Sequence, residues 1–268
     1  MYLGHAFQRP LEEKFVVVQW DRRGAGKSYA SDIDPNKMRV SREIDDTIEL
    51  MQFLRARFGG GHKVILVGHS YGSSLGLRVA VRRPDLIAAY VGVGQVACSP
   101  ADDHKIEYAW IAAEARKRGD LKTFNQAASG GDYDRESALF EYGGEIQKSR
   151  SFIDLVEIGL RAPEYSLMDI YKVKKGVDYT HAHLRDDVGN GRSMVAEVPR
   201  LAVPVYFFEG RHDYTAPFPC AEKYLAQLQA PSKHLVWFDH SAHFAFLEEP
   251  LKFAREIGRV AAQAGALS

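Results

Sequence analysis

Short runs of apolar β-branched and aromatic residues alternate along the chain with longer stretches in which apolar residues recur every three or four positions. The short runs predict strands near residues 15–20, 64–68, 88–94, 203–208 and 234–238. The longer stretches predict the main helices near residues 41–58, 71–82, 218–229 and 250–263. Because strands alternate with helices, the pattern favours an α/β fold, a mostly parallel sheet with helices on both faces.

The long segment 96–200 contains no convincing strand. Its first part, residues 102–118, has apolar residues spaced along one face of a helix. Glycine-rich breaks separate further helices that we predict over residues 133–148, 152–160 and 166–172. We therefore expect residues 1–95 and 201–268 to form the core. Residues 96–200 should form an inserted helical cap over the carboxyl ends of the strands.

A serine follows the predicted strand near 64–68 in the motif Gly-His-Ser-Tyr-Gly at residues 68–72. A Gly-x-Ser-x-Gly turn between a strand and a helix presents the serine on a strained backbone, and both flanking glycines are expected to avoid collisions there. The helix over 71–82 points its amino-terminal N–H groups toward the place where negative charge would develop. We expect Ser70 to be a nucleophile. The alternative is a strand-to-helix turn without chemistry, since the bare motif also occurs by chance.

An acid and a histidine follow in the order that such a serine triad requires. The strand near 203–208 leads into a loop with Asp213, and the strand near 234–238 leads into a loop with His243. In a triad the histidine takes the serine proton, and the acid fixes the histidine tautomer and stabilises the imidazolium. Each assignment has competitors nearby, and any of these side chains could instead be solvated at the surface. The competitors are Glu209 and Asp239 for the acid, and His212 and His240 for the histidine.

Four stretches make the chain resemble the α/β-hydrolase family and, within it, the proline iminopeptidase-like serine aminopeptidases. They are Trp-Asp-Arg-Arg-Gly-Ala-Gly-Lys-Ser at residues 20–28, the serine motif, Gly-Arg-His-Asp at 210–213 and Ser-Ala-His-Phe at 241–244. The resemblance implies an α/β-hydrolase fold and a triad of Ser70, Asp213 and His243. It also implies that the backbone N–H of Tyr71 is one oxyanion donor. Iminopeptidases commonly have Gly and Trp where this chain has His69 and Tyr71, which weakens the substrate assignment more than the mechanism.

The amino terminus departs further from that family. Residues 1–11 resemble the helix that follows a Gly-rich, His-containing oxyanion loop, and residues 15–20 resemble the next strand, but the loop and the strand before it have no match. Residues 15–20 would then either pair directly with residues 64–67 or leave a gap. We hypothesise an upstream in-frame extension or a shortened chain. Loss of one oxyanion donor typically costs about 10²–10³ in rate, so a shortened chain could keep the triad and be a feeble enzyme.

Composition limits the function classes. The 268 residues are 46% hydrophobic, enough for one sizeable core, and Lys+Arg and Asp+Glu both number 35. A neutral balance does not suggest nucleic-acid binding, which depends largely on a basic surface.

No apolar run has the length of a membrane span or the form of a signal sequence. We therefore expect no membrane partner and a cytoplasmic location, unless a signal peptide preceded Met1. Cys98 and Cys220 lie on different segments, which argues against a disulfide and for small buried hydrophobes.

Two other motifs fail on inspection. The sequence Gly-Ala-Gly-Lys-Ser at residues 24–28 would complete a phosphate-binding loop only if a glycine stood at Asp21. Two histidines, His181 and His183, precede a pair of aspartates at 186–187, but no further ligand of settled geometry is visible, so we expect a solvated loop and no metal. Several cap acids could neutralise the amino terminus of a substrate, as the aminopeptidase resemblance requires, although surface carboxylates on helices are common. They are Glu107, Glu114, Glu141 and Glu145.

The sequence therefore predicts a serine hydrolase that acts by acyl transfer without a metal or an organic cofactor. Ser70 attacks a carbonyl, His243 accepts and returns the proton, Asp213 orients His243, and water opens the acyl-enzyme. The expected substrate is a short peptide or amino-acid amide with a free amino terminus, proline being the usual preference of the family that the chain resembles. The alternatives are a carboxylesterase with the same triad and a non-catalytic binding protein with a hydrolase fold. The sequence does not specify the oligomeric state.

Overall fold

The computed structural model describes residues 4–59, 61–130, 134–148, 157 and 165–265. Four strands form one sheet in the order in which they occur along the chain, and every pair is parallel. They are β1 (Val64–His69), β2 (Ile87–Val93), β3 (Val205–Gly210) and β4 (Lys233–Phe238). The parallel sheet and four of the five strands expected from the sequence are confirmed.

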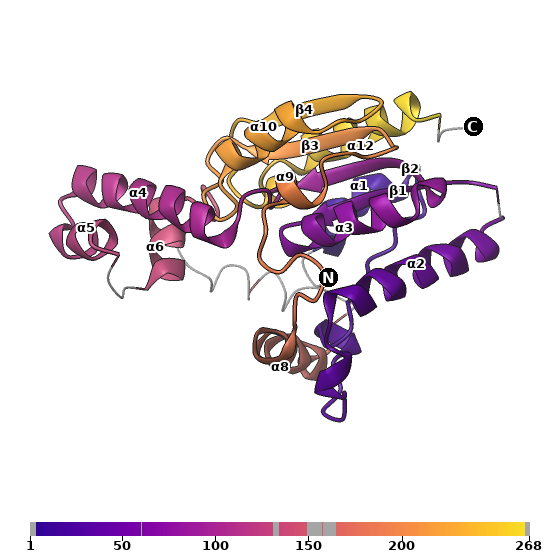
Figure 1. The fold of residues 1–268 in the computed structure, drawn as a ribbon, viewed down its shortest axis with the longest axis horizontal. Coiled ribbons are helices and arrows are strands. Elements are labelled where there is room, and N and C mark those ends of the chain that lie inside the picture. The colour runs from indigo at the N-terminus through magenta and orange to yellow at the C-terminus, as the bar shows by residue number, and fades with distance from the viewer. Residues whose placement is uncertain (1–3, 60, 131–133, 149–156, 158–164, 266–268) are drawn as a thin grey trace.

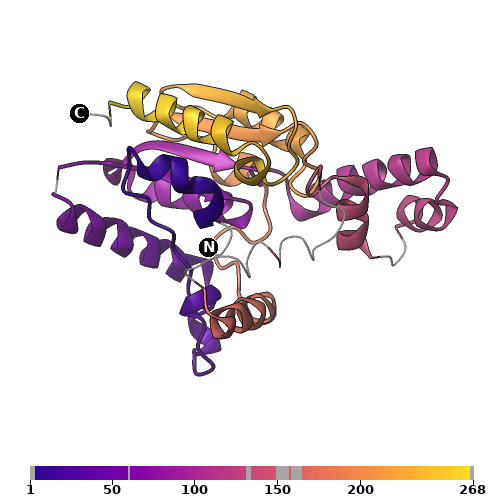
Figure 2. The same cartoon turned by 180° about the vertical axis from the view of Figure 1, so that it is seen from behind.

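Helices cover both faces of the sheet (Figures 1 and 2). On one face lie α2 (Val40–Arg57), α3 (Tyr71–Arg82) and α10 (Phe218–Gln227). On the other lie α1 (Gly4–Glu12) and α12 (Pro250–Gln263). Successive side chains of a strand point to opposite faces. Tyr90 and Phe207 therefore join the core under α3 and α10, whereas Val91 and Phe208 join the core under α12.

The predicted strand near 15–20 is wrong. Residues 16–20 form no regular element, although side chains in this segment alternate as in a strand: Val16 and Val18 are exposed, whereas Phe15 and Val17 pack against the core under α12. Within the described part of the chain, however, the backbone of residues 16–20 makes no ladder hydrogen bond, and the direct pairing with β1 does not occur. A strand requires a hydrogen-bonded neighbour as well as a pattern. β1 is consequently an edge strand with Val67 exposed.

The segment between β2 and β3 carries the helices α4 (Pro100–Arg118), α5 (Leu121–Ala128), α6 (Arg135–Tyr142), α8 (Leu167–His183) and α9 (Met194–Glu197). The first three pack around a cluster of their own beside the sheet, whereas α8 lies apart from them, against the short helix η1 (Gly26–Ser28) (Figure 1). The helix expected over 133–148 ends at Tyr142 because Gly143 adopts a left-handed conformation with φ 84°. The sequence did not predict α5, and the helix expected over 152–160 falls, except for residue 157, outside the described residues.

Hydrogen bonds at the ends of α4 explain its boundaries. Ser99 accepts a hydrogen bond from the backbone N–H of Asp102, and Pro100 occupies the first helical position. At the other end Gly119 adopts the left-handed conformation that closes many helices.

The remaining short elements are η2 (Pro35–Lys37), η3 (Pro84–Leu86) and α11 (Ala245–Glu248). The division into a core and a cap stays a prediction.

The expectation that the two cysteines are separate is wrong. Cys98, in the loop after β2, forms a disulfide with Cys220 on α10 across 122 positions of sequence. The segments meet because β2 pairs with β3, which brings the end of β2 close to the helix that follows β3. The spacing of two cysteines along a chain cannot reveal which segments the fold places side by side.

We expect the double variant Cys98→Ser, Cys220→Ser to lose about 2–5 kcal/mol in the free energy of unfolding, because the bond closes a long loop and restricts the unfolded chain. Urea unfolding with and without dithiothreitol measures the effect, and the reductant should lower the stability of the wild type only. Two titratable thiols in the unreduced, denatured wild type would contradict the bond.

Candidate active site

The serine motif forms a sharp turn between β1 and α3. Ser70 has φ 54° and ψ −126°, a conformation that residues other than glycine rarely adopt. A Cβ atom at Gly68 would lie 2.3 Å from the backbone oxygen of Gly72, so the turn accepts only glycine at residue 68. A Cβ at Gly72 would meet nothing within 4 Å. The expectation that both glycines prevent collisions is therefore right for Gly68 and wrong for Gly72, whose own Cα faces open space.

Hydrogen bonds hold the backbone of Ser70 in this conformation. Its N–H donates to the carbonyl of Val93 at the end of β2 (3.0 Å), and its carbonyl accepts from the N–H and the hydroxyl of Ser73 at 2.8 and 2.6 Å. The N–H of Tyr71, the first residue of α3, has no acceptor among the described residues. It is therefore free to donate to a bound ligand. The hydroxyl of Tyr71 donates to Glu43 on α2 at 2.6 Å, which fixes the start of α3 against that helix.

Asp213 and His243 form a buried pair. Nδ1 of His243 lies 2.8 Å from Oδ2 of Asp213, and their side chains are 3% and 0% exposed. The other carboxylate oxygen, Oδ1, accepts the backbone N–H groups of Thr215 and Ala216 at 3.0 and 2.9 Å. Burial by itself would lower the pKa of His243, but the negative charges of Asp213 and Glu145 outweigh it and raise that pKa.

Gly94 makes room for this pair. It follows β2 directly and has φ 52°, and a Cβ there would lie 2.7 Å from Nδ1 of His243 and 3.0 Å from Oδ2 of Asp213. Sequence reasoning missed Gly94 and also missed Thr215, which holds the acid. The only available signals were a glycine at the end of a predicted strand and a hydroxyl two residues after Asp213.

His69 connects the serine turn to the histidine loop. Its ring lies 4.6 Å from the ring of His243, measured between centroids, and its Nε2 lies 2.9 Å from the backbone oxygen of His243. Because a carbonyl only accepts, this nitrogen carries the proton. Among the described residues, the hydroxyl of Ser70 makes no hydrogen bond. The structure thus joins Asp213 to His243 and brings His69, the residue before Ser70, into contact with His243, without a direct Ser70–His243 hydrogen bond.

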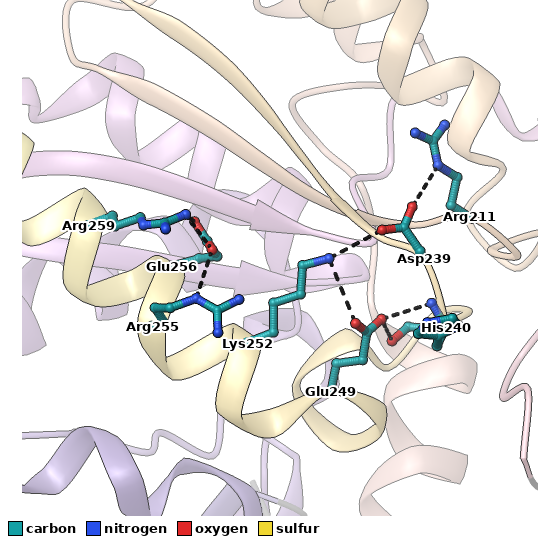
Figure 3. Close-up of polar contacts among 9 residues, drawn as sticks. Arg211, Asp239, His240, Glu249, Lys252, Arg255, Glu256 and Arg259 are labelled. Atoms are coloured by element: carbon teal, nitrogen blue, oxygen red, sulfur yellow. Dashed lines mark hydrogen bonds and ion pairs between the residues drawn. The ribbon is translucent and has the colours of Figure 1, made fainter.

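The competing residues lie in other surroundings. His212, His240 and Asp239 are exposed. Asp239 makes ion pairs with Arg211 and Lys252 at 3.2 and 3.4 Å (Figure 3).

Glu249 anchors the loop that contains His240. It accepts the N–H of His240 at 3.0 Å and the hydroxyl of Ser241 at 2.8 Å, which ties the loop to the start of α12 (Figure 3).

Glu209, the other competitor for the acid, is fully buried and accepts the N–H of Gln95 at 3.0 Å. Burial raises the pKa of Glu209 well above its usual range.

Residues of the two rejected motifs, at 24–28 and 181–187, make contacts unrelated to phosphate or metal binding. In the segment 24–28, the N–H of Lys27 and the hydroxyl of Ser28 donate to Asp21 at 3.0 and 2.7 Å. The solvated loop expected around His181 and His183 is wrong, because both histidines lie in the last turn of α8. Asp186, beyond the end of that helix, pairs with Arg78 at 3.3 Å. Among the described residues, the one cluster with the composition of a metal site contains Cys98, Cys220 and Asp103, and its two sulfur atoms are bonded to each other.

Comparison with known proteins gives consistent matches. The model of the alpha/beta hydrolase family matches residues 2–256. A probable aminopeptidase of Bacillus subtilis (strain 168), YbaC, is 32% identical over 268 residues, which cover 96% of this chain and 83% of the relative. A proline iminopeptidase of Heyndrickxia coagulans is 23% identical over 93% of this chain and 82% of its own. The crystal structure of a proline iminopeptidase from Mycobacterium smegmatis superposes with a TM-score of 0.65 at 16% identity, covering 98% of this chain and 86% of that one, which is a likeness of fold.

We expect His69→Gln to change how stability depends on pH. Burial and the nearby His243 lower the pKa of His69 from 6.5 to about 3. Between these values the unfolded chain binds a proton that the folded protein does not, so the wild type loses stability as the pH falls through this window, by up to about 1.4 kcal/mol per pH unit. Glutamine keeps a donor without this titration, and its stability should fall less steeply.

Urea unfolding at several pH values measures the difference between the two proteins. His240→Gln is the matched control, because His240 is exposed, and its curve should parallel that of the wild type. Parallel curves for the wild type and His69→Gln would contradict the prediction.

Proposed function

The chain belongs to the alpha/beta hydrolase family, and from this premise we propose that it is a serine hydrolase that acts by acyl transfer. The observation that carries the proposal is the buried contact between His243 and Asp213, at the same sheet edge as the strained Ser70. In this mechanism Ser70 attacks a carbonyl carbon, and its proton passes to Nε2 of His243, whose imidazolium is stabilised by Asp213. The free N–H of Tyr71 donates to the oxyanion.

The second half of the reaction reverses these roles. The leaving group takes the proton from His243, and water then attacks the acyl-enzyme while His243 acts as the base. No step in this scheme calls for a metal or an organic cofactor.

We propose further that the substrate is a short peptide or an amino-acid amide with a free amino terminus. Two acids on α4 support this substrate class. Burial raises the pKa of Asp103 to about 6 and that of Glu107 to about 7, and a cation bound beside them would favour their ionised forms. Glu107 is fully buried, and although one of its oxygens pairs with Arg135 at 2.8 Å, the other has no hydrogen-bond partner among the described residues. A substrate ammonium group would supply the missing donor. The names of the similar proteins, an aminopeptidase and an iminopeptidase, agree with this choice.

A fluorophosphonate probe and two substrate classes test the proposal. Wild type should be labelled, Ser70→Ala should not, and proline or alanine arylamides should be cleaved faster than short p-nitrophenyl esters. Labelling of Ser70→Ala would overturn the nucleophile, and faster cleavage of the esters would identify a carboxylesterase. A wild type that is neither labelled nor active would favour the non-catalytic binding protein.

The role of Glu107 gives a separate prediction. Glu107→Gln should lower kcat/KM for alanine arylamide about tenfold, the loss of a charge-assisted hydrogen bond, and leave the hydrolysis of an uncharged p-nitrophenyl ester nearly unchanged. Glu114→Gln is the matched control, because Glu114 lies on the same helix and pairs at the surface with Lys117. Equal losses for both substrates would indicate a structural role for Glu107.

The location of the protein is a further part of the proposal. No helix in the described ranges is both long and apolar enough to cross a membrane. The cytoplasmic location expected from the sequence stays a prediction, and the Cys98–Cys220 bond weighs against it because cytosolic thiols are kept reduced.

A further inference from the structure

Glu145, in the segment after α6, contacts both loops of the candidate site. Its backbone carbonyl accepts the N–H of His243 at 2.9 Å, and its carboxylate accepts a hydrogen bond from the hydroxyl of Thr215. Thr215 in turn donates its N–H to Asp213 at 3.0 Å. One residue from the segment between β2 and β3 therefore holds the acid loop and the histidine loop at the same time.

The neighbours of Glu145 reinforce this connection. The carbonyl of Gly144 accepts the N–H of Tyr214 at 3.1 Å, and the ring of Tyr214 stacks on Trp110 of α4 at 4.3 Å between centroids. A Cβ at Gly144 would lie 2.6 Å from that Trp110 ring, so the backbone passes close beneath it. The segment is thus fixed by α4 on one side and by the acid loop on the other, which leaves the Glu145 side chain little freedom.

The Glu145 carboxylate has a second effect, through its charge on the ring of His243. The groups that face the imidazole are Asp213 from the acid loop, Glu145 and the neutral ring of His69. Glu145 itself faces the negative charges of Asp213 and of Glu136 on α6. Burial is the largest influence on its pKa and raises it, whereas His243 and the Thr215 hydroxyl act in the opposite direction. The ionised form of Glu145 is therefore coupled to a proton on His243.

We propose that Glu145 is a positioning residue for the Asp213–His243 pair. Through Thr215 its carboxylate holds the loop of Asp213, and through its charge it stabilises the imidazolium that forms when His243 accepts a proton. The catalytic meaning of this inference rests on the proposed function, but the effect on the His243 imidazole exists whether or not the protein turns over a substrate.

The direct test is NMR titration of the ring C–H signal of His243 in the folded protein, assigned by its loss in His243→Asn. Glu145→Gln removes the charge and keeps an oxygen that accepts from Thr215. Because a nearby opposite charge raises the pKa of a histidine, we expect the midpoint of His243 to move down by about one pH unit. The exposed Glu49 on α2 gives the matched control Glu49→Gln, whose midpoint should stay at the wild-type value. A Glu145→Gln midpoint equal to that of the wild type would overturn the proposal.

Kinetic measurements separate the effect of the Glu145 charge from that of its hydrogen bond with Thr215. In Glu145→Gln the acid limb of the kcat/KM profile should move to lower pH by the same amount, since the base loses its proton more readily. Thr215→Val removes the hydroxyl and keeps the Glu145 side chain, so it should lower kcat several-fold with little change in KM. If Thr215→Val instead leaves kcat unchanged, the positioning part of the proposal fails. Absence of turnover in the wild type would count against the proposed function alone, because the NMR titration still measures the effect of the Glu145 charge on His243.

Discussion

The parallel pairing of the four strands is the constraint on which the site depends. Because all four run the same way, their carboxyl ends meet at one edge of the sheet, and the register places His69 beside Val93 and Gly210 beside Phe238. The serine turn, Gly94, Asp213 and the histidine loop each begin where one of these strands ends. Residues separated by more than a hundred positions in sequence thereby reach hydrogen-bond distance.

The strained backbone of Ser70 is tolerated because its surroundings restrict it from several sides. A residue other than glycine at positive φ costs of order 1–3 kcal/mol, and here the carbonyl of Val93 and the side chain of Ser73 each form a hydrogen bond with the Ser70 backbone that offsets part of this cost. The hydroxyl of Ser73 also accepts the N–H of Val96, so the turn is joined to the loop after β2. That loop contains Gly94 and Cys98. Strain at the serine and the disulfide are therefore features of one connected region.

Two neighbouring imidazoles show how environment divides chemical roles. His69 and His243 lie 4.6 Å apart, yet the pKa of the first is lowered and that of the second is raised. Two cations at this distance would repel each other, and the carboxylates are placed beside His243 alone. His69 consequently remains neutral and holds the backbone of its neighbour, whereas His243 is prepared to carry a proton. The same residue type thus supports the structure in one position and suits acid–base chemistry in the other.

The sequence by itself determined the local structure. Apolar periodicity gave four of the strands and most helices, and the motif around Ser70 and the order of Asp213 and His243 singled out the residues whose positions the fold brings to one edge. Tertiary structure decided the rest, because pairing between distant segments leaves no local pattern. Residues 15–20 alternate like a strand but pair with no strand in the described part of the chain, and two cysteines that look unrelated in sequence form a bond. Glu145 resembled any helical surface acid until the fold placed its carboxylate beside Thr215 and its charge near His243.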